Sequence, residues 1–364
     1  MKNLDQFRSK EIVKAVTEKL HGIYPGGTLK LMEVCGTHTM AIARYGLRGL
    51  MPEGLKLISG PGCPVCVTPA SIINAAQALS EIPETVIVTF CDMMRVPGTE
   101  KSLEVSKAEG ADVRVLYSVL DMLEMAEAQK DKHFIFISIG FETTTPGIAL
   151  SIMEADRRGL KNVYFLTANR LVIPAMDALC RSGETRIDGF LCPGHVSVII
   201  GYGAYRVIAR GYHVPCVVAG FEPVDILLAI SDIIDRIANK KAGVANAYGR
   251  AVTEEGNTNA IDVMYRVFKP VDAEWRGIGT IPVSGLELRE EFSSFDALKK
   301  FQIETVHLPD PEGCRCGDVL KGVLIPPECA LFGKRCRPET PVGPCMVSSE
   351  GSCAAYYKYG GDDV

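Results

Sequence analysis

The sequence predicts an α/β protein with two related parallel-sheet domains that face a cleft, and a small, irregular, cysteine-rich iron–sulfur domain at the C-terminus. Three observations support this fold class. Short apolar runs alternate with helix-length segments over the first 240 residues, which is typical of parallel strands joined by crossover helices. The tripeptide Gly-Phe-Glu follows an apolar run twice, at 140–142 and at 220–222. Six of the 13 cysteines lie in the last 51 residues, among loops rich in Gly and Pro.

The expected strands and helices alternate along the chain. Apolar runs predict strands at 29–34, 55–59, 85–90, 113–116, 133–139, 163–167, 189–191 and 216–219, with helices at 69–80, 102–109 and 173–181 between them. This pattern suggests a first α/β domain at 1–130, a second at 131–240 and the C-terminal domain at 241–364. Functional groups collect at the carboxyl ends of strands in open parallel sheets, and the most unusual peptides of this chain follow such ends.

Composition excludes several classes of protein. The net charge of −5 and the pI near 5.8 provide no basic surface for nucleic acid. No apolar run reaches the roughly 18 residues of a membrane span, and the charged N-terminal segment lacks the apolar core of a signal peptide. We therefore expect a cytoplasmic protein that binds neither membrane nor nucleic acid. Because stable disulfides are rare in that compartment, 13 cysteines indicate metal or redox chemistry.

The peptide Cys35-Gly-Thr-His38-Thr places a thiol and an imidazole three residues apart on a strand-to-helix turn. Backbone N–H groups and a nearby imidazole are expected to lower the Cys35 pKa and favour the thiolate. A thiolate and an imidazole are also ligands for a transition metal. The alternative is a buried cysteine followed by a helix-capping threonine.

The peptide Gly-Pro-Gly-Cys63-Pro-Val-Cys66 is a Cys-x-x-Cys pair in a tight turn. Such a pair closes a disulfide or binds a metal, and the redox interpretation is favoured because no second Cys-x-x-Cys pair completes a zinc site.

Two further turns carry polar groups. Glu142 lies in Gly-Phe-Glu-Thr-Thr-Thr, where it is expected to act as a general base, a proton relay or a hydrogen-bond anchor; the alternative is that the threonines only cap a helix. His195, in Pro-Gly-His-Val-Ser, has either a functional or a structural role.

The C-terminal segment carries the strongest signal. Its thiols are Cys314, Cys316, Cys329, Cys336, Cys345 and Cys353. The spacing lacks the repeated Cys-x-x-Cys pairs of zinc ribbons. Four thiolates hold a [4Fe–4S] cluster and would leave two as a dithiol, so an iron–sulfur cluster is favoured over structural zinc.

Together these motifs resemble one family, that of the hydrogenase maturation protein HypD. The five motifs occur in the family's order and span nearly the whole chain. The resemblance implies an assembly scaffold, rather than a conventional turnover enzyme, on which the Fe(CN)2CO unit of [NiFe] hydrogenases is built. A HypC-type small chaperone, a HypE-type cyanide donor and, indirectly, the hydrogenase large subunit are the implied partners.

The resemblance also implies roles for individual residues. Cys35 would bind the transient iron that carries the CN and CO ligands, with His38 beside it. Cys63 and Cys66 would form a redox pair between the iron site and the tail. The same cleft would be lined by Glu142 and His195, as proton or ligand handlers.

The tail is similar to the cluster site of ferredoxin–thioredoxin reductase, where a cluster lies beside a disulfide. This similarity implies a [4Fe–4S] cluster on Cys314, Cys329, Cys336 and Cys353, with Cys316 and Cys345 as the adjacent dithiol. Two other functions remain open: an iron–sulfur thiol–disulfide reductase that acts on a partner protein, and an α/β transferase with a structural metal in its tail.

Overall fold

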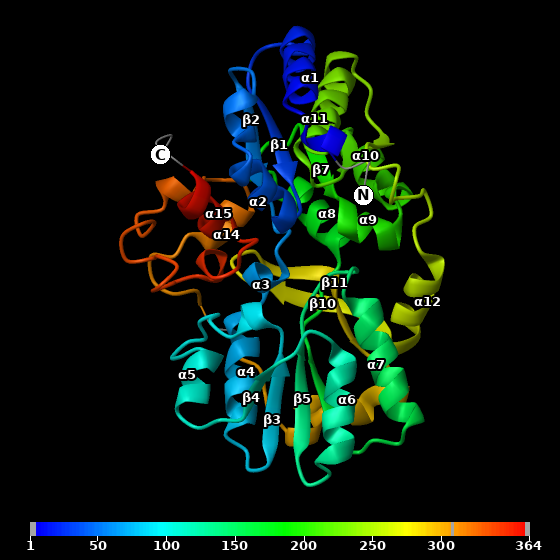
Figure 1. Cartoon of the computed structure of the whole chain (residues 1–364), viewed down its shortest axis with the longest axis vertical. Helices are drawn as coiled ribbons and strands as arrows, with labels where there is room; N and C mark the ends of the chain where they lie inside the picture. The colour runs from blue at the N-terminus through cyan, green and yellow to red at the C-terminus, as the bar shows by residue number, and fades with distance from the viewer. Residues whose placement is uncertain (1–4, 307–308, 361–364) are drawn as a thin grey trace.

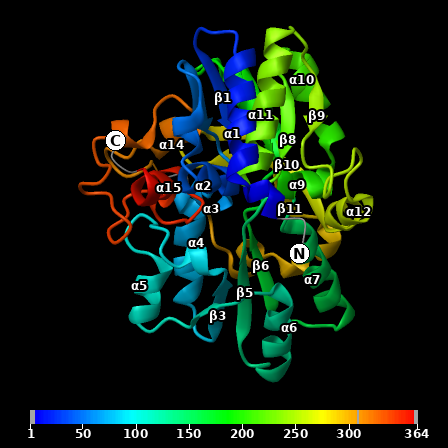
Figure 2. The ribbon, with the colours of Figure 1, turned by 45° about the horizontal axis from the view of Figure 1, so that its top comes forward.

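Two parallel sheets, one at each end of the molecule, form the framework of the protein (Figure 1). A computed structural model describes residues 5–306 and 309–360. A two-stranded antiparallel hairpin lies between the sheets, and the cysteine-rich tail packs along one side, next to α2 and α3, in both views (Figures 1 and 2). The α/β fold class with a cysteine-rich C-terminal region is therefore confirmed.

Sheet A has five parallel strands in the order β2-β1-β7-β8-β9. Their bounds are β1 Leu29–Glu33, β2 Leu55–Ser59, β7 Gly189–Pro193, β8 Cys216–Ala219 and β9 Val244–Asn246. Sheet B has four parallel strands in the order β4-β3-β5-β6. Its strands are β3 Thr85–Thr89, β4 Val113–Val115, β5 His133–Ser138 and β6 Val163–Thr167.

The chain crosses between the two sheets, so a division at residue 130 does not separate them. In sheet A, β1 pairs with β7, which follows it by more than 150 residues. In sheet B, β3 pairs with β5, although these strands lie on opposite sides of residue 130. Local apolar runs predict where strands form, but their partners are set by long-range packing, which the periodicity does not contain.

Helices cover both faces of each sheet, as parallel sheets require. They are α1 Lys10–Ile23, α2 Gly36–Arg44, α3 Pro64–Val67, α4 Ala70–Ser80, α5 Leu103–Ala108, α6 Val119–Ala128, α7 Thr145–Arg157, α8 Val172–Ser182, α9 Gly194–Ile200, α10 Arg206–Tyr212, α11 Pro223–Ala238, α12 Thr258–Val267, α13 Ala297–Phe301, α14 Cys316–Leu320 and α15 Ser352–Tyr359. Among the helices of residues 5–306 and 309–360, none is long and apolar enough to cross a membrane.

Three apolar clusters hold these layers together. One lies between α1, α11 and sheet A, and a second packs α6, α7 and α12 against sheet B. The third and largest extends from sheet A through the junction to sheet B and includes Trp275 and several tail cysteines. Because this cluster is continuous, the tail is part of the main core rather than an appended module.

The hairpin consists of β10 Phe268–Trp275 and β11 Gly279–Leu288. Backbone bonds join it to the segment between β6 and α8, among them Leu171 N–H to Ser284 O at 2.9 Å. Its tip reaches the region between α3 and the tail (Figure 1).

Candidate functional site

Three of the predicted motifs meet at the carboxyl edge of sheet A. The Cys35 turn follows β1, the Cys63–Cys66 turn follows β2 and the His195 turn follows β7. These strands are neighbours in the order β2-β1-β7. The strand-end rule therefore predicts correctly that these turns lie together.

The first two turns interlock through their backbones. Cys35 is buried at the N-terminus of α2, and the Gly36 N–H donates to Gly62 O at 3.2 Å. A Cβ atom on Gly62 would lie 2.1 Å from the Cys35 backbone nitrogen. Only glycine allows this approach, so the sequence Gly-Pro-Gly before Cys63 sets how closely the dithiol turn approaches Cys35.

The expected low pKa of Cys35 is wrong. Burial is the largest influence and, together with the charge of Glu350, it raises the pKa of the Cys35 thiol to about 12. Hydrogen bonds from the backbone N–H groups of His38 and Thr37 act in the lowering direction and are outweighed. Cys35 is thus a protonated thiol near neutral pH, and a metal that binds its sulfur must displace a proton.

His38 is also fully buried, and it is neutral. Burial lowers its pKa to about 4, although its ring bonds to backbone carbonyls. Its Nε2 lies 2.9 Å from Gly220 O, and its Nδ1 is buried without a hydrogen-bond partner among residues 5–306 and 309–360. Phe221 lies between the two predicted histidines, with ring centroids 5.0 Å from His38 and 4.0 Å from His195. Loss of water lowers the pKa of His195, although the nearby Glu350 opposes this shift.

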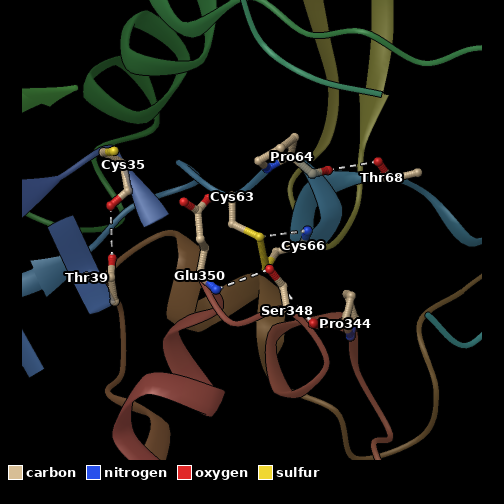
Figure 3. Close-up of a disulfide and its surroundings, with 9 residues drawn as sticks. All are labelled: Cys35, Thr39, Cys63, Pro64, Cys66, Thr68, Pro344, Ser348 and Glu350. Carbon is tan, nitrogen blue, oxygen red and sulfur yellow. Dashed lines mark hydrogen bonds between the residues drawn. A yellow bond between two sulfur atoms is a disulfide. The ribbon is translucent and has the colours of Figure 1, made fainter. Parts of the chain in front are cut away.

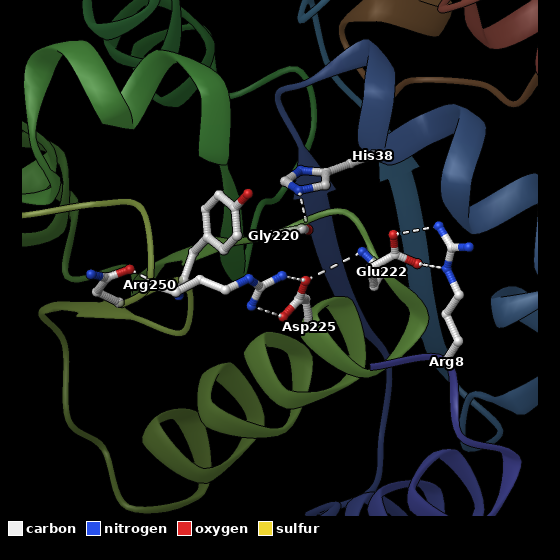
Figure 4. A network of polar contacts seen from close by, with 8 residues as sticks. Arg8, His38, Gly220, Glu222, Asp225 and Arg250 are labelled. Carbon is white, nitrogen blue, oxygen red and sulfur yellow. Dashed lines mark hydrogen bonds and ion pairs between the residues drawn. The ribbon is translucent and has the colours of Figure 1, made fainter. Parts of the chain in front are cut away.

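A charge network fixes the turn that holds His38 (Figure 4). Arg250 donates to both carboxylate oxygens of Asp225, at 2.7 and 2.5 Å. Asp225 is fully buried and accepts the backbone N–H of Glu222, which begins α11 with a capping box. Arg8 in turn donates to both oxygens of Glu222. These bonds hold residues 220–222, whose first carbonyl bonds to His38.

Cys63 and Cys66 are joined by a disulfide (Figure 3). Cys63 caps the short helix α3, since its sulfur accepts the Cys66 N–H at 3.2 Å, and Pro64 starts the helix. Both cysteines are buried. The Cys66 sulfur lies 4.0 Å from Pro344 O, directly before Cys345 of the tail. The disulfide is therefore placed between the Cys35 turn and the tail.

Sequence analysis misses one residue of this site, Glu350. Thr37 donates to its carboxylate at 2.5 Å, and its charge acts on both Cys35 and His195. Figure 3 shows it beside Cys35 and the disulfide. Glu350 comes from the loop before α15, far away in sequence, and a single acid in a loop carries no periodic signal that could have revealed it.

Glu142 lies at the carboxyl end of a strand of the other sheet. It follows β5 of sheet B, and its Oε1 accepts the Val172 N–H at 3.0 Å, at the start of α8. Its Oε2 is buried with no hydrogen-bond partner in the part of the chain that the structure describes, and burial raises the pKa of Glu142 to about 7. The charge of Glu142 helps to raise the pKa of Tyr205, which is raised chiefly by burial. Glu142 is thus a buried carboxyl group at the strand end of sheet B.

The tail thiols cluster, but not into a finished metal site. Hydrogen bonding to Cys316 is the largest influence that raises the pKa of both Cys314 and Cys345, and Cys353 adds to the shift of Cys345. Cys336 accepts the Val342 N–H at 3.4 Å. Within the described parts of the chain, no three His, Cys, Asp or Glu side chains already have a metal-binding arrangement.

The donor set nevertheless suits a thiolate-bound cluster. Free thiols from several loops face one another, and a Cβ on Gly343 would lie 2.7 and 2.6 Å from the sulfurs of Cys314 and Cys316, so the glycine keeps space open beside them. Cys329 is half-buried, and its charge helps to raise the pKa of the neighbouring Arg315.

The fold and the site together define a class: a cysteine-rich α/β protein with a disulfide beside a buried thiol and imidazole. Comparison with known families gives the assignment. Residues 9–360 match the HypD family, described as "Hydrogenase formation hypA family". The chain belongs to the HypD family of hydrogenase maturation factors, as the motif resemblance predicted.

Several relatives cover nearly the full length. The chain is 42% identical over 369 residues to "Hydrogenase maturation factor HypD2" of Bradyrhizobium diazoefficiens, which covers 99% of this chain and 97% of that protein. Identity is also 42% to the hydrogenase maturation factors HypD of Rhizobium leguminosarum bv. viciae, over 99% of this chain and 96% of that protein, and of Cupriavidus necator, over 99% and 97%.

Proposed function

We propose that this hydrogenase maturation factor is the scaffold on which an iron ion receives its cyanide and carbonyl ligands. The observation that carries the proposal is the convergence of Cys35, the Cys63–Cys66 disulfide, His195 and Glu350 at one edge of sheet A. A single-electron carrier or a structural thiol would not need all four groups together.

Iron is the cargo of this site, and Cys35 is its proposed ligand. The buried thiol releases its proton when the metal binds, because only the thiolate is a ligand. Glu350 lies beside this thiol, since its charge acts on Cys35 and its carboxylate accepts the Thr37 hydroxyl. The neutral His38 and the ring of His195 complete the surroundings.

The dithiol supplies the electrons for cyanide release. Cyanide on a partner's sulfur, as a thiocyanate, is freed by two electrons and two protons. The reduced Cys63–Cys66 pair provides both and closes to the disulfide, while the partner thiol and hydrogen cyanide leave, so that atoms and electrons balance.

The tail is proposed to hold a [4Fe–4S] cluster through Cys314, Cys329, Cys336 and Cys353, with Cys316 and Cys345 as the neighbouring dithiol. Cys316 contacts both Cys345 and Cys314, so the proposed dithiol lies next to a proposed cluster ligand. When bound, such a cluster supplies single electrons. The tail dithiol passes electrons in pairs to the Cys63–Cys66 disulfide, next to which Pro344 lies.

The partners are proposed by the same reasoning. A HypC-type chaperone would add a second ligand to the iron, a HypE-type protein would donate cyanide, and the hydrogenase large subunit would receive the finished unit. The relatives that carry the name hydrogenase maturation factor are consistent with this assignment.

Infrared spectroscopy tests the proposal. The protein is purified anaerobically with its small partner, and the cyanide and carbonyl stretching region is recorded for the wild type, Cys35→Ser and Cys91→Ser. The exposed Cys91 is the matched control. Bands that vanish only in Cys35→Ser support the scaffold. Absence of bands in an iron-loaded wild-type complex refutes it.

The second candidate is a thiol–disulfide reductase that acts on a partner protein. The disulfide between the Cys35 turn and the tail favours it. A reductase keeps full activity in Cys35→Ser, because that cysteine lies outside the pair. Loss of hydrogenase maturation in Cys35→Ser with intact dithiol reduction would exclude the reductase as the main function.

A further inference from the structure

We propose that the tip of the hairpin, Trp275–Gly277, is a clamp that holds the Cys63–Cys66 dithiol and the tail thiols at the separation needed for exchange, and that Arg276 is its positioning residue. The inference rests on the dithiol chemistry of the proposed function. It adds an element that none of the cysteine motifs contains.

The clamp contacts the dithiol turn at the residue directly after Cys66. The Arg276 backbone N–H donates to Val67 O at 2.9 Å. Val67 is the last residue of α3, the helix that begins at the disulfide. Cys66 and Val67 are fully buried, so no water replaces this bond if the tip moves away.

The clamp contacts the tail at the residue directly after Cys316. Gly277 has a φ of 70°, and a Cβ there would lie 2.5 Å from Gly317 Cα. A Cβ on Gly317 would lie 2.2 Å from Gly277 O. Both positions therefore need glycine, because the two backbones are in direct contact. One turn of chain thus touches the neighbour of each thiol pair.

The tip itself is fixed by side chains. The guanidinium of Arg276, which is only 3% exposed, donates from Nε to Asp310 Oδ1 at 2.9 Å and from Nη1 to Pro97 O at 3.2 Å. The fully buried Trp275 donates from Nε1 to Ser284 Oγ at 2.7 Å. Its ring lies 5.9 Å from that of Phe141. The tip is thereby anchored to the sheet B side, the loop after β3 and the start of the tail.

The reaction that depends on this spacing is thiol–disulfide exchange. A thiolate of the Cys316/Cys345 pair attacks the Cys63–Cys66 disulfide, and a mixed disulfide forms and is resolved by the second tail thiol. The tail pair becomes a disulfide and Cys63 and Cys66 become thiols, with two electrons and two protons transferred. Attack requires the sulfurs in line, so small displacements slow this exchange more than reduction by a small reagent.

The test uses Arg276→Lys, which keeps the charge and the backbone N–H but loses the planar fork that reaches both Asp310 and Pro97. Arg289→Lys is the matched control, since Arg289 lies just after β11 and its half-buried side chain donates to Tyr265 O. Each full-length protein receives one equivalent of dithiothreitol. Quenched alkylation and mass spectrometry then follow how electrons redistribute between the two thiol pairs.

We expect redistribution at least tenfold slower in Arg276→Lys and unchanged in Arg289→Lys, while excess reductant opens the disulfide at the wild-type rate in both. Gly317→Ala is expected to slow the redistribution of electrons as well. If Gly317→Ala does not fold, the result for Arg276→Lys alone decides the test. A wild-type redistribution rate in Arg276→Lys, or equal slowing in Arg289→Lys, overturns the clamp alone. A wild-type chain without any exchange between the pairs overturns the dithiol step of the proposed function and the clamp with it.

Discussion

Replacement of Asp225 by Asn tests whether the buried charge pair beneath the His38 turn determines local stability. The Asp225 carboxylate is fully buried and accepts two bonds from Arg250 and one from the Glu222 backbone. The guanidinium of Arg250 also stacks between the rings of Phe7 and Tyr248, at 4.0 and 4.5 Å from their centroids. The amide keeps the shape of the side chain but leaves this cation without its counter-charge.

The expected loss follows from the burial of each partner. Removal of one partner from a buried pair costs about 3–5 kcal/mol. The Arg250 side chain is 33% exposed, so water recovers part of the cost, and we expect about 3 kcal/mol, roughly a 100-fold change in the folding equilibrium. The Gly220 turn should loosen with it, since Asp225 holds the start of α11.

Urea unfolding followed by circular dichroism measures this effect, with the slope of the transition checked for constancy. Asp232→Asn is the matched control, because Asp232 is on the same helix and pairs with Arg236 at the surface at 2.8 Å. Such a pair contributes about 0.3–0.5 kcal/mol. The reasoning is refuted if the two variants lose the same stability.

Three further predictions follow. Glu142→Gln is expected to raise the free energy of unfolding by about 3 kcal/mol above pH 7 and to leave it unchanged below pH 4.5. The folded pKa of Glu142 is raised to about 7, so the wild type loses stability as the buried carboxyl ionises with rising pH, whereas the neutral amide does not. Unfolding measured at pH 4.5 and 8 checks this. Alkylation of Cys35 by iodoacetamide at pH 7.5 should be slower than that of the exposed Cys91, and Glu350→Gln should speed it; equal rates for both thiols contradict the burial argument. Trp275→Ala should lower the free energy of unfolding by about 3–5 kcal/mol, because it leaves a cavity in the core. Thermal unfolding measures this loss, and a smaller loss contradicts the cavity argument.

Local sequence patterns predict the strands and the functional turns because both depend on neighbouring residues. Thr85–Thr89 consists of five β-branched residues, Thr-Val-Ile-Val-Thr, and all five are buried. The strand ends at Glu33 and Ser59 are followed directly by the cysteine turns. Because functional groups collect at the carboxyl ends of parallel strands, the sequence predicts that Cys35 lies near the dithiol even though the strand order is not known.

Properties that depend on distant residues could not be predicted in this way. The thiolate expected at Cys35 follows from local N–H groups, but burial by the rest of the fold reverses its pKa. Glu142 has a strand-end position like the other motifs, but its strand joins sheet B, and this assignment depends on long-range strand pairing. Glu350 and Arg276 act through tertiary contacts alone.

The crossing of the chain between the sheets has a consequence for its synthesis. Strand β1 meets β7 only after some 156 further residues have been made, and the Pro344 carbonyl beside Cys66 is made 278 residues after that cysteine. At ~5–20 residues per second, the second interval is roughly 14–56 s. During that time the nascent chain carries the Cys63 and Cys66 thiols without the tail that covers them. The pair is thus exposed to cellular thiols and metal ions until the tail has been synthesised.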